Sequence, residues 1–235
     1  IWRGKMKIQG IQKLTLLDYP EKIACTIFTY GCNLRCYFCQ NASLVLENKY
    51  ITDYISEEEL LNFLKKRIGL LDAVCISGGE PLIHDEVFDL IKKIKNLGYL
   101  VKVDTNGTYP EKIDKLIKEN LVDYIAMDVK NSKENYLKTV GIDNLDIKKI
   151  EKSIDLLKKS NIDYEFRTTI TEEYHSEKDI KEIGKMLEGS KKHFLQYYRY
   201  SDDVIGDKLS TPSTKIMEKY KKILEKYIEI VEIRG

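Results

Sequence analysis

The feature that most constrains the fold is a regular alternation of short apolar runs with amphipathic helical patterns. Residues 23–29 read as a buried apolar strand, and residues 73–77, 100–103 and 124–127 read as further strands. Residues 163–170 alternate like a strand, and residues 193–200 read as the sixth. Strands that alternate with helices argue for a parallel sheet joined by right-handed crossovers. No linker, repeat or low-complexity tract interrupts the pattern, so we predict one α/β domain over residues 23–235. Periodicity alone does not separate an open doubly wound sheet from a barrel.

Helical patterns fill the gaps between these runs, and several carry their own start or stop signals. Ser56 with Glu59 fits a capping box, Gly98 fits a helix end, and Pro110 fits a helix start. Residues 228–233 fit either a short strand or a helix tail. Residues 1–22 precede the first predicted strand as an N-terminal segment, in which Met6 is the expected native start and residues 1–5 are an added extension.

Composition excludes several classes of protein. The chain has 235 residues, of which 43% are hydrophobic, and its net charge of +1 gives no reason to expect nucleic acid or an anionic membrane as a partner. No apolar run approaches the ~20 residues that cross a bilayer, and the basic N-terminus lacks the apolar region of a signal peptide. Five cysteines form no even disulfide framework. We therefore expect a cytoplasmic protein with reduced thiols.

Three cysteines, Cys32, Cys36 and Cys39, lie in a C-x3-C-x2-C pattern within residues 29–41, which we call the cysteine segment. Structural zinc sites are closed by four ligands, whereas a four-iron cluster held by three thiolates keeps one iron open for chemistry. A zinc loop completed by a distant Cys or His is the alternative, and the odd number argues against a disulfide. Cys25 and Cys75 lie inside apolar runs and are expected to be buried, which leaves no cysteines for a second cluster.

Polar residues fall at the carboxyl ends of the predicted strands, where parallel α/β proteins form their sites. The cysteine segment follows the first strand. The later strands carry, on or just after them, Gly78, Gly79, Glu80 and Pro81; Asp104 and Thr105; Asp128 and Lys130; Arg167; and residues 196–199. Each group alone is compatible with a turn, a cap or a surface ion pair. Together, in register with the cysteine segment, they predict one site at the mouth of the sheet.

With Phe38 directly before its last cysteine, the cysteine segment resembles the signature loop of the radical S-adenosylmethionine (SAM) superfamily. Residues 78–80, GGE, resemble the motif that holds the SAM ammonium in that superfamily. Residues 104–107, DTNG, and 128–130, DVK, are similar to stretches of the pyruvate formate-lyase activating enzyme. Residues 13–41 most resemble activating proteins of the anaerobic ribonucleoside-triphosphate reductase. The resemblance implies an incomplete (β/α)6 barrel with parallel strands in a single domain.

The resemblance also implies roles for individual residues. Cys32, Cys36 and Cys39 would hold a [4Fe–4S] cluster, and the SAM site would comprise Phe38, Gly78, Gly79, Glu80, Asp104, Asp128, Lys130, Arg167 and Tyr198. Glycine lets the backbone approach a ligand closely, Glu80 can accept from the SAM ammonium, and Lys130 and Arg167 can neutralise its carboxylate.

Two carboxylates at neighbouring strand ends need a cation between them. The SAM ammonium or Lys130 would meet that need. By the resemblance, a monovalent metal ion held by Asp104, Thr105 and Asp128, with a main-chain carbonyl near Ala126, would also meet it.

The sequence departs from the family pattern at three positions. The family often has Pro and His where this chain has Tyr37 and Gln40, and Tyr198 stands where the activating enzyme has a histidine that faces SAM. These departures concern the protein target rather than the chemistry.

The activity that the resemblance implies is reductive cleavage of SAM to methionine and a 5′-deoxyadenosyl radical. The electron would come from a low-potential donor of the flavodoxin or ferredoxin type. The radical would take a hydrogen atom from a glycine of a partner enzyme, as in activation of the anaerobic ribonucleotide reductase. The chain has little sequence left to cover the mouth of the site, which favours a macromolecular substrate. Two alternatives stay open: a radical SAM enzyme acting on a small metabolite such as a deazapurine precursor, and a non-catalytic metal-binding module.

Overall fold

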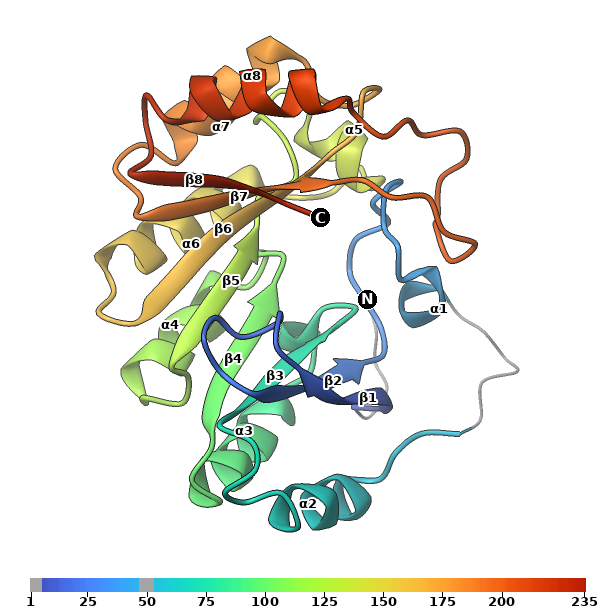
Figure 1. Cartoon of the computed structure of the whole chain (residues 1–235), viewed down its shortest axis with the longest axis vertical. Coiled ribbons are helices and arrows are strands. Elements are labelled where there is room, and N and C mark those ends of the chain that lie inside the picture. Colours follow the sequence, from blue (N-terminus) through green and yellow to red (C-terminus); the bar gives the residue numbers. More distant parts are fainter. Residues whose placement is uncertain (1–5, 47–52) are drawn as a thin grey trace. The chain divides into compact units, whose positions relative to one another are not determined.

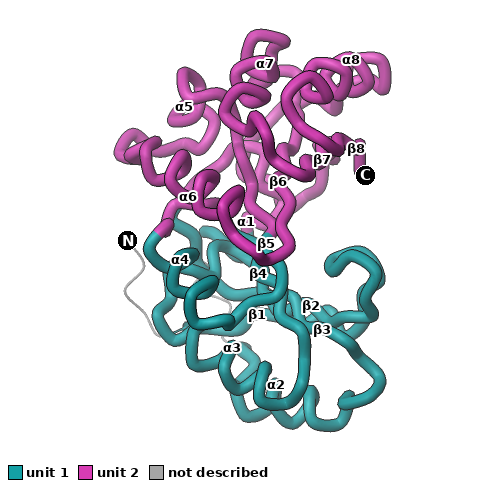
Figure 2. Tube along the Cα trace, turned by 90° about the vertical axis from the view of Figure 1, so that its left-hand side faces the viewer, with its two compact units in different colours: residues 1–33, 43–105, 111–125 teal, residues 34–42, 106–110, 126–235 magenta. Residues whose placement is uncertain are grey.

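The computed structural model describes residues 6–46 and 53–235, so the predicted N-terminal extension, residues 1–5, lies outside it. The chain divides into two compact units, which Figure 2 draws in two colours. Unit 1 comprises the described residues up to 33 together with 43–105 and 111–125. Unit 2 comprises residues 34–42, 106–110 and 126–235. The division passes through the cysteine segment, because Cys32 belongs to unit 1 and Cys36 and Cys39 belong to unit 2.

Unit 1 contains the strands β1 (Ile8–Thr15), β2 (Ala24–Thr29), β3 (Ala73–Gly78) and β4 (Leu100–Thr105). β1 is antiparallel to β2, whereas β2, β3 and β4 are parallel, with Ala24 opposite Ala73 and Ala73 opposite Leu100. The helices of this half of the chain are α1 (Ala42–Val45), α2 (Glu57–Lys65), the 3-10 helix η1 (Pro81–Ile83), α3 (Val87–Asn96) and α4 (Pro110–Lys118) (Figure 1).

β5 (Tyr124–Asp128) begins in unit 1 and ends in unit 2. Unit 2 continues with α5 (Tyr136–Val140), α6 (Ile147–Lys159), β6 (Asp163–Ile170), α7 (Glu177–Met186), β7 (Lys192–Tyr197), α8 (Thr214–Leu224) and β8 (Ile230–Arg234). β6, β7 and β8 are parallel, with Phe166 opposite His193 and Lys192 opposite Ile230. Helices α7 and α8 pack side by side (Figure 1). Neighbouring strands within each unit follow their sequence order, from β1 to β4 in unit 1 and from β6 to β8 in unit 2.

The structure agrees with two local predictions, the helix start at Ser56 and the burial of Cys25 and Cys75. Ser56 Oγ accepts from the Glu59 amide, and the Glu59 carboxylate accepts from the Ser56 amide at 2.8 Å, so the predicted capping box of α2 is confirmed. Cys25 and Cys75 have no exposed surface, and burial raises the pKa of both thiols to about 12. Both cysteines therefore serve as small apolar side chains of the sheet.

The predicted α/β class with parallel strands is confirmed, and the differences lie at its edges. β1 was not predicted, and α1, α5 and η1 are too short to show a period. The last predicted run extended to residue 200, but β7 ends at Tyr197. Residues 228–233 belong mainly to a strand, β8, rather than to a helix tail.

Within residues 6–46 and 53–235, no helix combines the length and apolar character that a membrane crossing requires.

Candidate active site

The end of β3 packs directly against the start of the cysteine segment in unit 1. The Gly79 amide donates to the Thr29 carbonyl at 2.9 Å, and the Glu80 amide donates to the Gly31 carbonyl at 2.8 Å. A Cβ placed on Gly79 would lie 2.0 Å from the Gly31 oxygen and 3.3 Å from Cys32 Cβ. Gly78 has a φ of +119°, and a Cβ there would lie 2.3 Å from the Thr29 oxygen. Both glycines are required because two backbone segments touch at this point, one of which carries a candidate cluster ligand.

Glu80 is almost completely buried beside this junction. Its Oε1 accepts from Thr105 Oγ1 at 2.8 Å and from the Leu82 amide at 3.1 Å, where it caps η1. Buried carboxylates are stable only when hydrogen-bonded, and these donors fix the side chain at the carboxyl end of β3. His84 lies just beyond η1, and its Nε2 is 2.8 Å from the Tyr30 carbonyl, so it braces the entry to the cysteine segment.

Asp104 at the end of β4 already has a cation beside it. Lys102 Nζ is 2.6 Å from Asp104 Oδ1, and Ser77 Oγ donates to Oδ2 at 2.9 Å. The Lys102 side chain is 2% exposed. Our sequence reasoning did not single out Lys102. The available signal was the strand period, which places residues 102 and 104 on the same face of β4.

Asp128, Lys130 and Arg167 form one charge cluster in unit 2. Lys130 Nζ is 2.9 Å from Asp128 Oδ2, and Arg167 Nε is 2.8 Å from Asp128 Oδ1. Burial by itself would raise the pKa of Asp128, but Arg167 and Lys130 outweigh it and hold that pKa well below its usual range. Two cations on one carboxylate leave the cluster with a net positive charge, which suits an anionic group of a ligand.

The second half of the cysteine segment lies beside this cluster in unit 2. Phe38 is 4% exposed, and Lys130 Nζ is 5.8 Å from the centre of its ring. Burial raises the pKa of the Cys36 thiol to about 11, and Lys130 counteracts part of this rise. Burial also raises the pKa of Cys39, whose amide donates to the Cys36 carbonyl at 3.0 Å in a tight turn. Burial therefore favours the neutral thiol form of both cysteines while no metal is bound.

The loop after β6 supports the same region, and sequence reasoning missed it. Tyr174 stacks on Tyr37 with ring centres 5.8 Å apart, and the His175 ring lies 6.1 Å from that of Phe38. His175 Nε2 lies 2.9 Å from the Lys130 carbonyl, which can only accept, so Nε2 carries the proton and donates to it. Nδ1 lies 3.2 Å from the Thr171 amide, from which it can accept. His175 was not among the predicted site residues, and nothing in the sequence indicates these partners.

Asp179 ties the loop after β5 to helix α7. Its carboxylate accepts from Ser132 Oγ at 2.6 Å and Asn135 Nδ2 at 2.7 Å, and it completes a capping box with Ser176. Burial alone would raise the pKa of Asp179, but these hydrogen bonds, led by that of Ser132, lower it to about 2. The network fixes the backbone that follows Lys130.

Tyr198 follows β7 and is fully buried. Within the described residues, its hydroxyl has no hydrogen-bond partner, and neither does the buried hydroxyl of Thr171 at the end of neighbouring β6. An unpartnered buried polar group costs about 1–3 kcal/mol, so two at adjacent strand ends fit a site that takes a polar ligand. Thr171 was not among the predicted site residues.

The predicted site residues divide between the two units. Unit 1 holds Cys32, Gly78, Gly79, Glu80, Asp104 and Thr105, and unit 2 holds Cys36, Phe38, Cys39, Asp128, Lys130, Arg167 and Tyr198. Within the described residues, neither unit by itself groups three Cys, His, Asp or Glu side chains as ligands of one metal ion. The three-thiolate cluster remains a prediction from the sequence.

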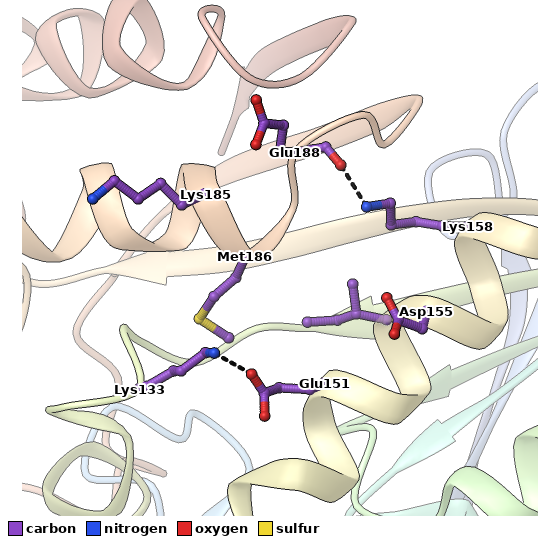
Figure 3. Close-up of a pocket in the computed structure, with 8 residues that line it drawn as sticks. Lys133, Glu151, Asp155, Lys158, Lys185, Met186 and Glu188 are labelled. Atoms are coloured by element: carbon purple, nitrogen blue, oxygen red, sulfur yellow. Dashed lines mark hydrogen bonds and ion pairs between the residues drawn. The ribbon is translucent and has the colours of Figure 1, made fainter.

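A pocket of about 360 Å³ lies elsewhere in unit 2, beside α6 and the end of α7 (Figure 3). Its lining has both signs of charge, with an ion pair between Lys133 and Glu151 and a hydrogen bond from Lys158 to the Glu188 carbonyl. It contains none of the predicted site residues, so we do not assign it to the active site.

Comparisons with known proteins agree with the site. A protein of Methanocaldococcus jannaschii, whose name gives a provisional assignment as a glycyl-radical enzyme activating enzyme, is 39% identical over 98% of this chain and 96% of its own. A 7-carboxy-7-deazaguanine synthase of Halobacterium salinarum is 38% identical, but over only 34% of this chain and 30% of its own. A crystallised domain of pyruvate-formate lyase-activating enzyme from Bacteroides vulgatus has a TM-score of 0.56 at 23% identity and covers 69% of this chain and 99% of that one.

The structural likeness confirms the predicted fold class, and the sequence comparisons identify the family. The profile that matches residues 26–187 is that of the Radical SAM superfamily, and the match starts within β2 and ends just after α7. It includes the cysteine segment, residues 78–80 and the polar ends of β4, β5 and β6. The chain belongs to the radical SAM superfamily.

Proposed function

We propose that this radical SAM enzyme is an activase that generates a glycyl radical on a partner enzyme. The observation that carries the proposal is the 39% identity, over nearly the whole of both chains, to the M. jannaschii protein named as an activating enzyme. Family membership implies a [4Fe–4S] cluster and SAM as cofactors. Bound together, these cofactors supply a 5′-deoxyadenosyl radical, the species that removes a hydrogen atom from the glycine Cα.

The residues of this chain would hold and orient those cofactors. Cys32, Cys36 and Cys39 supply three thiolates, and their loop is braced by contacts within each unit. The positive Asp128–Lys130–Arg167 cluster would bind the SAM carboxylate, and the carboxylate of Glu80 would bind its ammonium. The unpartnered hydroxyls of Tyr198 and Thr171 would take polar atoms of the same ligand.

Asp104, Thr105 and Asp128 were predicted as ligands of a monovalent metal ion. Each of them has other partners in the structure. Lys102 and Ser77 bind Asp104, Thr105 donates to Glu80, and Lys130 and Arg167 bind Asp128. Lys102 beside Asp104, and Lys130 and Arg167 beside Asp128, are cationic, so this arrangement does not fit a metal ion.

The partner, electron donor and location follow from the same proposal. The first partner to test is an anaerobic ribonucleotide reductase, because residues 13–41 resemble its activating proteins. A flavodoxin or ferredoxin would supply the electron, and reduced thiols at the cluster are consistent with a cytoplasmic site of action.

The decisive experiment is electron paramagnetic resonance of the anaerobically reconstituted protein with SAM, a low-potential reductant and the candidate partner. We expect a glycyl-radical doublet and one 5′-deoxyadenosine per radical. A partner variant with alanine at the radical glycine should abolish the doublet while uncoupled SAM cleavage continues. If no glycyl-radical enzyme of the source organism gives the doublet while SAM is cleaved, the activase proposal is wrong.

A second candidate is action on a small metabolite such as a deazapurine precursor. The 38% identity to the deazaguanine synthase favours it, although that match covers only 34% of this chain. This candidate predicts that the precursor alone, without a protein partner, stimulates formation of 5′-deoxyadenosine and yields a new product by mass spectrometry. The third alternative, a non-catalytic metal-binding module, has no support in the comparisons.

A further inference from the structure

We infer that the ammonium of Lys102 takes the place of a monovalent metal ion at Asp104, so that SAM binding by this protein requires no added K⁺ or Na⁺. The inference rests on the SAM site of the proposed function, but not on the identity of the partner enzyme.

Lys102 is built into unit 1 as the permanent counter-ion of Asp104. The two residues lie two positions apart on β4, so their side chains project from the same face of the sheet. Nζ lies 2.6 Å from Oδ1, and the side chains of Lys102 and Asp104 are only 2% and 16% exposed. An ammonium buried to this degree is stable only beside an anion, and Asp104 is the acid to which it is bound.

The other side-chain atoms predicted to bind the metal ion, the second oxygen of Asp104 and the hydroxyl of Thr105, also have hydrogen-bond partners. Ser77 Oγ donates to Asp104 Oδ2 at 2.9 Å, so each carboxylate oxygen accepts a hydrogen bond. The Thr105 hydroxyl points its proton at Glu80 Oε1, at 2.8 Å. A metal ion bound to Asp104 would lie next to the Lys102 ammonium, and like charges at that distance in a buried site repel strongly.

Asp128 in unit 2 repeats the arrangement with other residues. Lys130 and Arg167 bind one carboxylate oxygen each, at 2.9 and 2.8 Å. Each of the two predicted metal-binding carboxylates is therefore neutralised within its own unit by side chains of this chain. The charge that a diffusible cation would supply is present without one.

The test measures SAM binding to the reconstituted protein by isothermal titration calorimetry. It compares KCl, NaCl and tetramethylammonium chloride at a fixed ionic strength of about 0.1 M, because tetramethylammonium screens charge without binding a small site. We expect the dissociation constant of the wild-type protein to change by less than about twofold among the three salts. Lys102→Met should weaken binding by about tenfold or more in tetramethylammonium, and KCl or NaCl should restore most of it.

Two further variants keep the inference falsifiable. Lys102→Met/Asp104→Asn removes the pair together and should lose the response to K⁺, even if Lys102→Met alone folds poorly. Lys93→Met removes an exposed lysine paired with Glu57 and is the matched control, with no expected effect. Melting temperatures of each variant in the three salts give a second readout that does not depend on turnover.

Either of two results would overturn the inference. One is a wild-type protein whose SAM affinity falls by about tenfold without K⁺ or Na⁺. The other is a folded Lys102→Met variant that binds SAM equally in all three salts. Failure to activate a glycyl-radical enzyme would leave both measurements unchanged, so the two proposals fail separately.

Discussion

Gly79→Ala should be among the most damaging single substitutions in unit 1, because the obstacle to the new methyl group is backbone. An ordinary van der Waals contact begins at 3.4 Å, whereas the Cβ would lie 2.0 Å from the Gly31 oxygen. The end of β3 and the start of the cysteine segment would have to separate by about 1 Å or more. That movement would break the hydrogen bonds from Gly79 to Thr29 and from Glu80 to Gly31, now 2.9 and 2.8 Å long.

The expected cost combines these losses. Overpacking costs about 1–3 kcal/mol, and each of two hydrogen bonds contributes about 0.5–1.5 kcal/mol. We therefore expect about 4 kcal/mol, which for a chain of this size corresponds to a fall in melting temperature of about 8–16 °C. Because Gly31 adjoins Cys32, the iron content after reconstitution should fall as well.

Gly98→Ala is the matched control. Gly98 has a φ of +91° and nothing within 4 Å of its would-be Cβ, so this variant isolates backbone strain. Its cost should be about 1 kcal/mol, or about 2–4 °C, with unchanged iron content. Thermal unfolding followed by circular dichroism, with iron and sulfide analysis, measures both effects. A Gly79→Ala protein that melts as high as the Gly98→Ala protein would refute the steric argument.

Three further predictions concern the charges and thiols. Replacing any one of the three cysteines of the cysteine segment by serine should lower the iron bound per chain severalfold. The Cys75→Ser protein should bind as much iron as the wild type but lose about 1–3 kcal/mol of stability, and iron analysis with thermal melts measures both effects. Arg167→Met should raise the SAM dissociation constant by about tenfold or more with iron content unchanged, and equal affinity in calorimetry would contradict its role. The pKa of Asp179 is lowered to about 2, so its stabilisation is complete above the unfolded value near ~3.9 and is lost as pH falls toward 2. Urea titrations of wild type and Asp179→Asn should accordingly differ by a constant amount from pH 8 to about 5 and converge in stronger acid, and a gap that persists to pH 2 would rule this out.

The places of several candidate site residues at strand ends were predictable, because they depend on strand order alone. Runs of apolar, β-branched residues predict buried strands, and the residues that follow parallel strands lie at one edge of the sheet. Glu80, Asp104 and Asp128 were predicted in this way, and Arg167 was predicted from its place on the strand at residues 163–170. The capping box at Ser56 was predictable because its partners lie three residues apart.

The other contacts could not be predicted, because no sequence pattern identifies their partners. His175 binds the backbone carbonyl of Lys130, 45 residues away, and any residue type offers a carbonyl. β1 mixes glycine and polar residues with isoleucine, is half exposed, and slips register twice against β2, so its pairing is decided by tertiary contacts rather than by a period. The ion pair of Lys102 could have been predicted, because a lysine in a buried strand needs an acid on the same face.

The four methylene groups of Lys102 make its ammonium a tethered ion. A diffusible ion gives up translational freedom each time it binds, whereas a side chain has given it up once, on folding. Its effective concentration at Asp104 is fixed by the fold and does not follow the composition of the surrounding fluid. The same tether removes a means of control: a protein that carries its own counter-ion cannot be switched off by depletion of that ion.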